Sequence, residues 1–99
     1  MSFNRYAKQR DLNEPDLIVF AKGCGIELVK TDKPLDWLSG WRGQWIPTEI
    51  KRPEKEGHAD EFTPAQRLFI ARARDCRLPV WVWRTSDDVL RSIGARRSA

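Results

Sequence analysis

Histidine, cysteine and long apolar segments are all scarce in this sequence. Its two cysteines, Cys24 and Cys76, lack the spacing of zinc ligands or of a Cys-x-x-Cys pair. We therefore expect reduced thiols in a cytoplasmic protein, although the sequence leaves a pairing between them open. No apolar run approaches the ~20 residues that span a membrane. The charged residues 1–10 are not followed by the apolar segment of a secretion signal, so we expect no membrane partner.

The length and charge of the chain limit its fold and its partners. With 99 residues, 40% of them hydrophobic and 32% charged, the chain can form one domain around a single modest core. Lysine and arginine outnumber aspartate and glutamate by 18 to 14, and the resulting net charge of +4 favours a polyanionic partner. We divide the chain into a basic N-terminal arm (1–9), a domain (10–94) and a basic tail (95–99). The arm is either solvated or neutralises phosphates of a nucleic acid.

The beginning of the domain has the pattern of a helix followed by a strand. Asn13 or Glu14 can begin the helix, and Gly23 and Gly25 can end it. The alternating residues 26–31 predict the first strand.

Residues 35–50 have the pattern of an antiparallel hairpin. Apolar residues lie on both sides of a glycine-rich turn that includes Ser39, Gly40 and Gly43. Pro47 is unusual in the second strand because it cannot donate a ladder hydrogen bond. We expect an edge position, a bulge or a strand that begins after it, and the exact register stays open.

The C-terminal half predicts a loop, a helix, a strand and a last helix. Residues 52–61 are polar and predict a mobile loop, and Thr63 with Pro64 predicts the start of a helix. The apolar run 79–84 predicts a central strand covered on both faces, and Ser86, with Asp87 and Asp88 after it, is expected to cap the last helix. The crossover is long enough for parallel pairing with the hairpin, which gives an α/β domain of order αβββαβα with a mixed sheet flanked by helices. We expect the apolar side chains of the Thr63 helix to pack inward, namely Ala65, Leu68, Phe69, Ile70 and Ala73.

Two carboxylates and an ammonium group can converge on the hairpin. Side chains alternate along a strand, so Glu49 and Lys51 project from one face. If Asp36 crosses the strand pair on that face, its carboxylate meets that of Glu49, and a cation is needed between them. Hard carboxylate oxygens suit Mg²⁺ or Mn²⁺, and the lysine can orient or deprotonate a water molecule. This set of groups indicates a metal-dependent phosphodiesterase.

Glu14 is a further candidate for the acidic set. It shares a helix face with Leu17 and Ile18, so we expect a buried carboxylate close to Asp36. An acidic residue in the first turn is also common simply because it interacts favourably with the helix dipole.

The acidic residues and the lysine, in this order on a hairpin, resemble the PD-(D/E)XK nuclease superfamily, although Glu-x-Lys alone occurs by chance in many basic proteins. Four stretches narrow the resemblance to the VRR-NUC branch, the virus-type replication-repair nucleases, in its stand-alone phage or bacterial form. They are Arg10-Asp11-Leu12-Asn13-Glu14, Pro34-Leu35-Asp36-Trp37-Leu38-Ser39-Gly40, Glu49-Ile50-Lys51-Arg52-Pro53 and Phe62-Thr63-Pro64-Ala65-Gln66. The similarity spans residues 10–93, whereas Pro47 departs from the apolar residue expected there.

The resemblance implies a restriction-endonuclease-like core and a role for each site residue. Asp36, Glu49 and the main-chain carbonyl of Ile50 would ligate Mg²⁺ or Mn²⁺, and Glu14 would complete the set directly or through water. Lys51 would position the attacking water molecule, whose pKa the metal lowers.

Gln66 and four arginines complete the candidate site. Gln66 is either an ordinary surface residue or, as the resemblance implies, helps to hold Lys51 or the nucleophile. The candidates for phosphate contacts are Arg10, Arg42, Arg52 and Arg67.

These features predict a metal-dependent DNA endonuclease of the bacterial or phage-infected cytoplasm. We expect selectivity for Holliday junctions or other branched DNA, with duplex DNA as the simpler substrate, and no organic cofactor. One alternative is a DNA-binding module with a nuclease fold but without catalysis, or a subunit of a larger phage or repair complex. Another is a basic protein-interaction domain, which would need no metal.

Tryptophan is the one abundant aromatic residue and predicts a homodimer. Five tryptophans exceed what so small a core can bury, and Trp41, beside the glycines of the turn, is hard to cover within one chain. An exposed tryptophan favours a protein interface, and its other use is stacking on an unpaired base.

Overall fold

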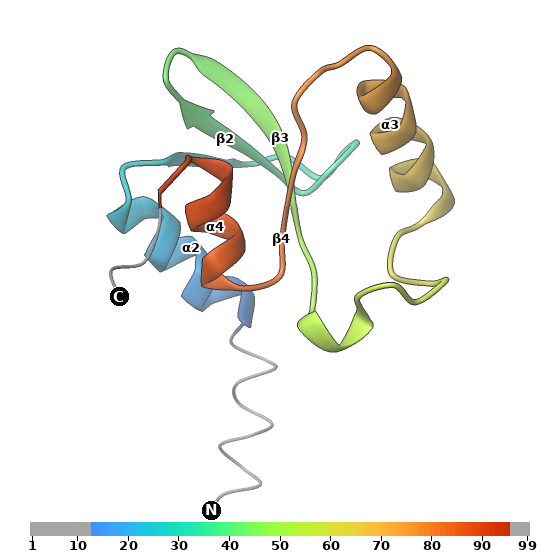
Figure 1. Cartoon of the computed structure of the whole chain (residues 1–99), viewed down its shortest axis with the longest axis horizontal. Helices are drawn as coiled ribbons and strands as arrows, with labels where there is room; N and C mark the ends of the chain where they lie inside the picture. Colours follow the sequence, from blue (N-terminus) through green and yellow to red (C-terminus); the bar gives the residue numbers. More distant parts are fainter. Residues whose placement is uncertain (1–12, 96–99) are drawn as a thin grey trace, which may run out of the picture.

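The computed structural model describes residues 13–95, which form one α/β domain with helices on both faces of a mixed sheet (Figure 1). The elements follow the predicted order αβββαβα. The helices are α2 (Asn13–Gly23), α3 (Pro64–Asp75) and α4 (Ser86–Ser92), with a short 3-10 turn, η1 (Pro53–Lys55), before α3. The strands are β1 (Glu27–Lys30), β2 (Trp37–Trp41), β3 (Gln44–Ile50) and β4 (Trp81–Trp83). The predicted arm and residues 96–99 lie outside the described part of the chain.

The four strands are arranged in the order β1-β2-β3-β4. The pairs β1–β2 and β2–β3 are antiparallel, whereas β3 and β4 are parallel, as the crossover through α3 allows. Pro47 lies within β3 opposite Leu38, but β4 pairs only with Thr48–Ile50. At Pro47, β3 is therefore paired with β2 alone and is locally an edge strand. An edge position was one of the three expected arrangements.

A two-residue turn joins β2 to β3. Arg42 and Gly43 have φ angles of 51° and 82°, which suit a tight hairpin with the natural strand twist. Ser39 and Gly40 pair within β2, so their predicted place in the turn is wrong. Gly40 is needed for another reason: a Cβ atom there would lie 3.0 Å from the ring of Trp45.

The main core fills the space between the sheet and helices α2 and α4. Alternation along β3 sends Ile50 into this core and Glu49 and Lys51 to the opposite face, toward α3. The buried residues of the core are Leu17, Ala21, Ile26, Leu28, Ile50, Trp83 and Val89. Figure 1 shows α2 and α4 together on one side of the sheet and α3 on the other.

Threonine caps begin both C-terminal helices. Thr63 caps α3 as predicted: its Oγ1 accepts a hydrogen bond from the Gln66 N–H. Oε1 of Gln66 accepts a hydrogen bond from the Thr63 N–H in return, which was not predicted. The last helix has the same arrangement between Thr85 and Asp88. Its cap is therefore Thr85, and the prediction of a cap at Ser86 is wrong by one residue.

Two predictions about burial in the C-terminal half are wrong. The strand β4 lies at an edge of the sheet, not in its centre, because within the described residues it pairs with β3 alone. On α3, Ala73 is buried, but Leu68 is 56% exposed and Ala65 is exposed as well. An apolar strand or an apolar helix face indicates packing against the rest of the domain, but neither pattern indicates how many of its side chains are covered.

The exposed tryptophan is Trp45, and the prediction of an exposed Trp41 is wrong. Trp41 packs against the core, whereas Trp45 is 53% exposed. Cys24 and Cys76 are both free thiols. No helix within residues 13–95 is long and apolar enough to cross a membrane.

Candidate active site

Asp36 and Glu49 meet at the end of the hairpin that is remote from its turn. Trp37 pairs with Thr48, so the residue before Trp37 lies beside the residue after Thr48. The main-chain N–H of Asp36 donates a hydrogen bond to Oε1 of Glu49 over 3.0 Å. The hairpin thus brings together the two acidic residues that the sequence predicted to converge.

Lys51 joins these two residues on the same face of the sheet. Its Nζ atom lies 3.3 Å from Oε2 of Glu49 and 5.3 Å from the centroid of the Phe62 ring. The Glu49 side chain is only 2% exposed. The pKa of Glu49 is raised above its ordinary value, mainly because the carboxyl group is buried. The nearby carboxylate of Asp36 raises this pKa further, whereas the hydrogen bond from the Asp36 N–H and the positive charge of Lys51 lower it without cancelling the rise.

The chemistry of this group fits a magnesium or manganese ion. A buried carboxylate whose pKa is raised by desolvation gains most from a nearby cation. No three or more His, Cys, Asp or Glu side chains gather as a ligand set within residues 13–95. Mg²⁺ is nevertheless commonly bound by one or two carboxylates together with water molecules and substrate phosphates. Asp36 and Glu49 would hold such an ion, with the Ile50 carbonyl next to Glu49 in the chain.

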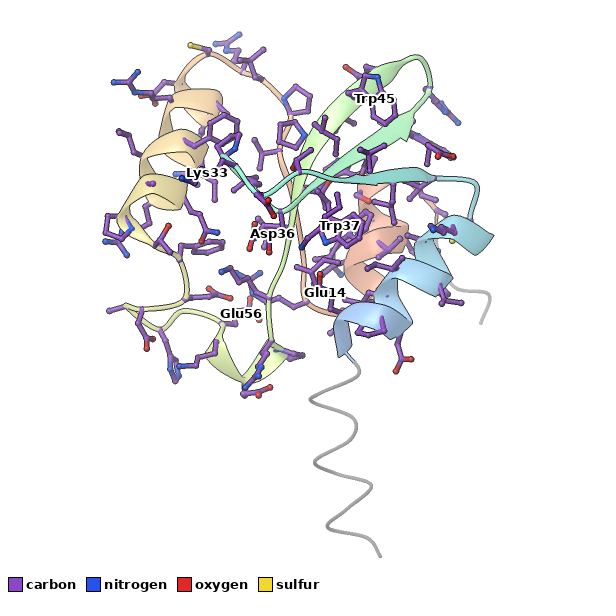
Figure 2. All side chains as sticks on the ribbon, turned by 180° about the vertical axis from the view of Figure 1, so that it is seen from behind. Glu14, Lys33, Asp36, Trp37, Trp45 and Glu56 are labelled. Atoms are coloured by element: carbon purple, nitrogen blue, oxygen red, sulfur yellow. The ribbon has the colours of Figure 1, made fainter. Side chains whose placement is uncertain are left out.

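Glu14 is not grouped with the other acidic residues. Its Oε2 atom accepts a hydrogen bond from Nε1 of Trp37 over 2.9 Å and lies 3.9 Å from Nζ of Lys30. The Glu14 side chain is 41% exposed, so the prediction of a buried carboxylate is wrong. Figure 2 shows Glu14 close to Trp37. Trp37 itself packs against the α2 core, opposite the face that carries Glu49.

Gln66 has a structural task at the start of α3. Its Oε1 atom accepts the hydrogen bond from the Thr63 N–H that closes the capping box of α3. The helix start therefore fixes this side-chain oxygen, and the predicted role of Gln66 beside Lys51 stays a prediction.

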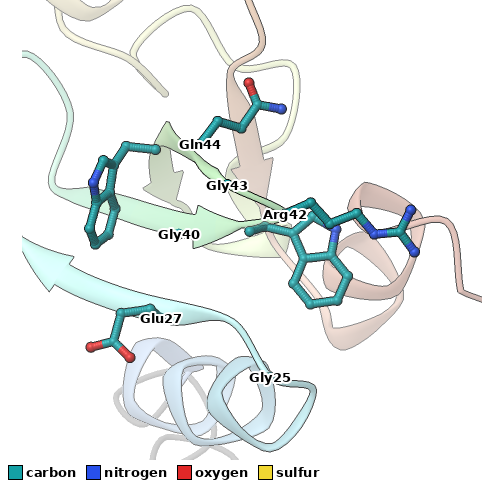
Figure 3. Close-up of a pocket in the computed structure, with 8 residues that line it drawn as sticks. Gly25, Glu27, Gly40, Arg42, Gly43 and Gln44 are labelled. Carbon is teal, nitrogen blue, oxygen red and sulfur yellow. The ribbon is translucent and has the colours of Figure 1, made fainter.

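The predicted DNA-binding arginines are dispersed over the domain. Arg10 lies outside the described residues. Arg42 lies at the hairpin tip, beside a pocket of about 540 Å³ that also includes Glu27 and Gly40 (Figure 3). At about 3.3 Å per residue along the strand, the tip is roughly 20 Å from Asp36, so one phosphate cannot contact both.

The other two arginines lie nearer the acidic residues. Arg52 is exposed and directly follows Lys51. Arg67, on α3, donates from Nη1 to the carbonyl oxygens of Ala59 and Phe62 over 3.1 and 2.9 Å. These two bonds hold the Arg67 guanidinium beside Phe62, whose ring contacts Lys51.

An ion pair that the sequence did not predict supports the loop after Lys51. Arg84 donates from Nε to Oε2 of Glu61 over 2.7 Å and from Nη2 to Oε1 over 3.0 Å. Hydrogen bonds from Arg84 lower the pKa of Glu61 despite the burial of this carboxylate, and Lys51 adds to the effect. The polar composition of residues 52–61 did not indicate a buried carboxylate, but Glu61 is only 7% exposed. The partners are 23 residues apart, so no local pattern connects them.

Comparison with known proteins gives no match among family models, curated proteins or solved structures. The resemblance to the PD-(D/E)XK nucleases therefore stays a prediction that depends on the residues described above.

Proposed function

We propose that this protein is a Mg²⁺- or Mn²⁺-dependent DNA endonuclease of the VRR-NUC type. The observation that carries the proposal is the buried carboxylate of Glu49, which accepts a hydrogen bond from the main-chain N–H of Asp36 and lies 3.3 Å from Nζ of Lys51. The αβββαβα order and the antiparallel hairpin that bears the acidic pair agree with a restriction-endonuclease-like core. The net charge of +4 suits a nucleic-acid substrate.

Each residue of the group has a defined task in this proposal. Asp36 and Glu49 hold the cation, together with the Ile50 carbonyl. When bound, a divalent cation would polarise the scissile phosphate and lower the pKa of a water molecule. Lys51, held by Glu49, orients the water for attack on phosphorus. Glu14 acts indirectly, because its hydrogen bond to Trp37 fixes the residue next to Asp36.

A cleavage assay on a panel of DNAs tests the proposal. Linear duplex, nicked duplex, a flap and a four-way junction are incubated with the protein in Mg²⁺, Mn²⁺ or EDTA. We expect cleavage only with a divalent ion and fastest on a branched DNA. Lys51→Ala should abolish cleavage while Mn²⁺ binding persists, and Glu54→Gln, a change at an exposed residue, should cleave normally. Binding of DNA without any cleavage would favour the non-catalytic module instead.

The active form in this proposal is a homodimer. Two cuts in a branched DNA need two active sites at a fixed separation, and one copy supplies only one. Trp45, 53% exposed, borders an apolar groove of about 570 Å³ with Pro47, Phe69 and Leu78. A second copy that covers this groove would bury the largest exposed aromatic side chain of the described chain.

A further inference from the structure

A pocket of about 550 Å³ lies between α3 and β4, and its lining combines apolar and cationic groups. This volume is within the range of about 300–1,000 Å³ that is usual for ligand sites. The apolar part of the lining consists of Phe62, Ile70, Ala71 and Val82. The cationic part consists of Arg67, Arg74 and Arg84, and we call the whole the arginine pocket.

Two of the three guanidinium groups keep an uncompensated positive charge. The charge of Arg84 is neutralised by its two hydrogen bonds to Glu61. Arg67 donates from Nη1 to the main-chain carbonyls of Ala59 and Phe62 and forms no ion pair within residues 13–95, and a carbonyl does not cancel its charge. Arg74 forms no ion pair with any residue of the described range 13–95. The pocket therefore attracts an anion that also carries an apolar surface.

The arginine pocket shares a wall with the candidate active site. Phe62 lines the pocket, and Nζ of Lys51 lies 5.3 Å from the centroid of its ring. A group in the pocket would thus lie one aromatic ring away from the lysine that contacts Glu49.

We propose that the arginine pocket binds an unpaired nucleotide of the DNA substrate. The base lies against Phe62 and the apolar wall, where stacking on an aromatic ring is favourable for every base. Arg67 and Arg74 bind the phosphate of this nucleotide. Bases of an intact duplex are stacked and cannot enter such a pocket, so the substrate class is DNA with an unpaired base next to the cut. This inference rests on the proposed nuclease function and specifies its substrate.

Binding measurements in EDTA test this proposal separately from cleavage. The full chain is titrated into three fluorescent DNAs: a paired duplex, the same duplex with one bulged nucleotide, and one with an abasic site in the bulge. We expect the bulged DNA to bind roughly five- to a hundredfold more tightly than the other two, which is the range for stacking of one base. The abasic DNA has the same backbone and charge, so it isolates the contribution of the base.

Substitutions on α3 provide matched controls. Ala71→Leu, which fills the pocket without a change in charge, should remove most of the preference for the bulged DNA. Arg74→Gln should weaken binding of the bulged DNA more than binding of the paired duplex. Arg72→Gln removes the same charge from an exposed position on the same helix that does not line this pocket, and should weaken binding to all three DNAs equally. Circular dichroism checks that each variant is folded.

The outcomes separate the two proposals. Equal binding of the three DNAs, or equal effects of Arg74→Gln and Arg72→Gln, would overturn the pocket even if the protein cleaves DNA with Mg²⁺. A preference for the bulge without cleavage would support the pocket and refute the nuclease. If a free deoxynucleoside monophosphate bound as tightly as the bulged DNA, the ligand would be a mononucleotide and the DNA proposal would be wrong.

Discussion

Replacing Glu49 by glutamine should make the metal-free protein more stable and at the same time inactive. Glutamine has nearly the same shape and still accepts the hydrogen bond from the Asp36 N–H, but it removes a negative charge from a side chain that is 2% exposed. The pKa of Glu49 is raised in the fold, mainly by burial. Between the ordinary value of 4.5 and the raised value, the native state binds more protons than the unfolded state. Stability therefore falls as the pH rises through this window.

The size of the effect follows from this linkage. Each pKa unit by which the fold raises the value costs about 1.4 kcal/mol at neutral pH. Glu49→Gln removes this cost, so its free energy of unfolding should exceed that of the wild type at pH 7 and should equal it near pH 4. Each kcal/mol changes the melting temperature by about 4–8 °C in a domain of this size. Urea or thermal unfolding in EDTA at both pH values measures the difference.

Mn²⁺ should reverse the order of stability. At a hundred times its dissociation constant, a bound ion stabilises the wild type by about 2.7 kcal/mol, which corresponds to about 10 °C or more. Glu49→Gln should lose most of this gain and cleave DNA roughly 10³-fold more slowly, equivalent to about 4 kcal/mol of transition-state stabilisation. Glu54→Gln, at an exposed position, is the control and should change neither property. A Glu49→Gln variant that is less stable than the wild type in EDTA, or that Mn²⁺ still stabilises fully, would refute the reasoning.

Three further substitutions test separate parts of the structure. Glu61→Gln should cost about 2–4 kcal/mol at pH 7, less than a fully buried pair because the Arg84 side chain is 19% exposed. The pKa of Glu61 is lowered in the fold, so the stabilisation by its ion pair is present above pH 4.5 and is lost as the pH falls through the lowered pKa. If urea unfolding showed the same loss of stability in Glu61→Gln at pH 7 and at pH 2, this explanation would be wrong. Glu14→Gln should weaken Mn²⁺ binding less than Glu49→Gln does, because the Glu14 carboxylate is hydrogen-bonded to Trp37. A calorimetric titration in which Glu14→Gln weakens Mn²⁺ binding more would indicate that Glu14 is a metal ligand. Trp45→Ala should convert dimers to monomers in light scattering with the fold intact, and a wild type that is monomeric at micromolar concentration with and without DNA would end the dimer proposal.

The sequence by itself determined the parts of this protein that depend on neighbouring residues. The capping box at Thr63 and the pairing of Asp36 with Glu49 each arise within a single helix start or a single hairpin. In a hairpin, the turn sets the register, and the alternation of side chains then sets which groups share a face. For that reason Glu49 and Lys51 could be assigned to one face from the sequence, whereas the meeting of Asp36 with Glu49 depended on a register that the sequence left open.

The tertiary structure decided which surfaces are covered and which distant residues meet. Alternation puts Trp41 and Trp45 on opposite faces of the sheet, but only the packing of α2 and α4 against one face decides that Trp41 is the covered one. Glu61 meets Arg84 only because the crossover returns the chain beside β3 as the parallel strand β4. The same return places Arg84 opposite α3 and forms the arginine pocket. Contacts between residues far apart in the sequence depend on how separate helices and strands pack, and the periodicity of the sequence does not predict that packing.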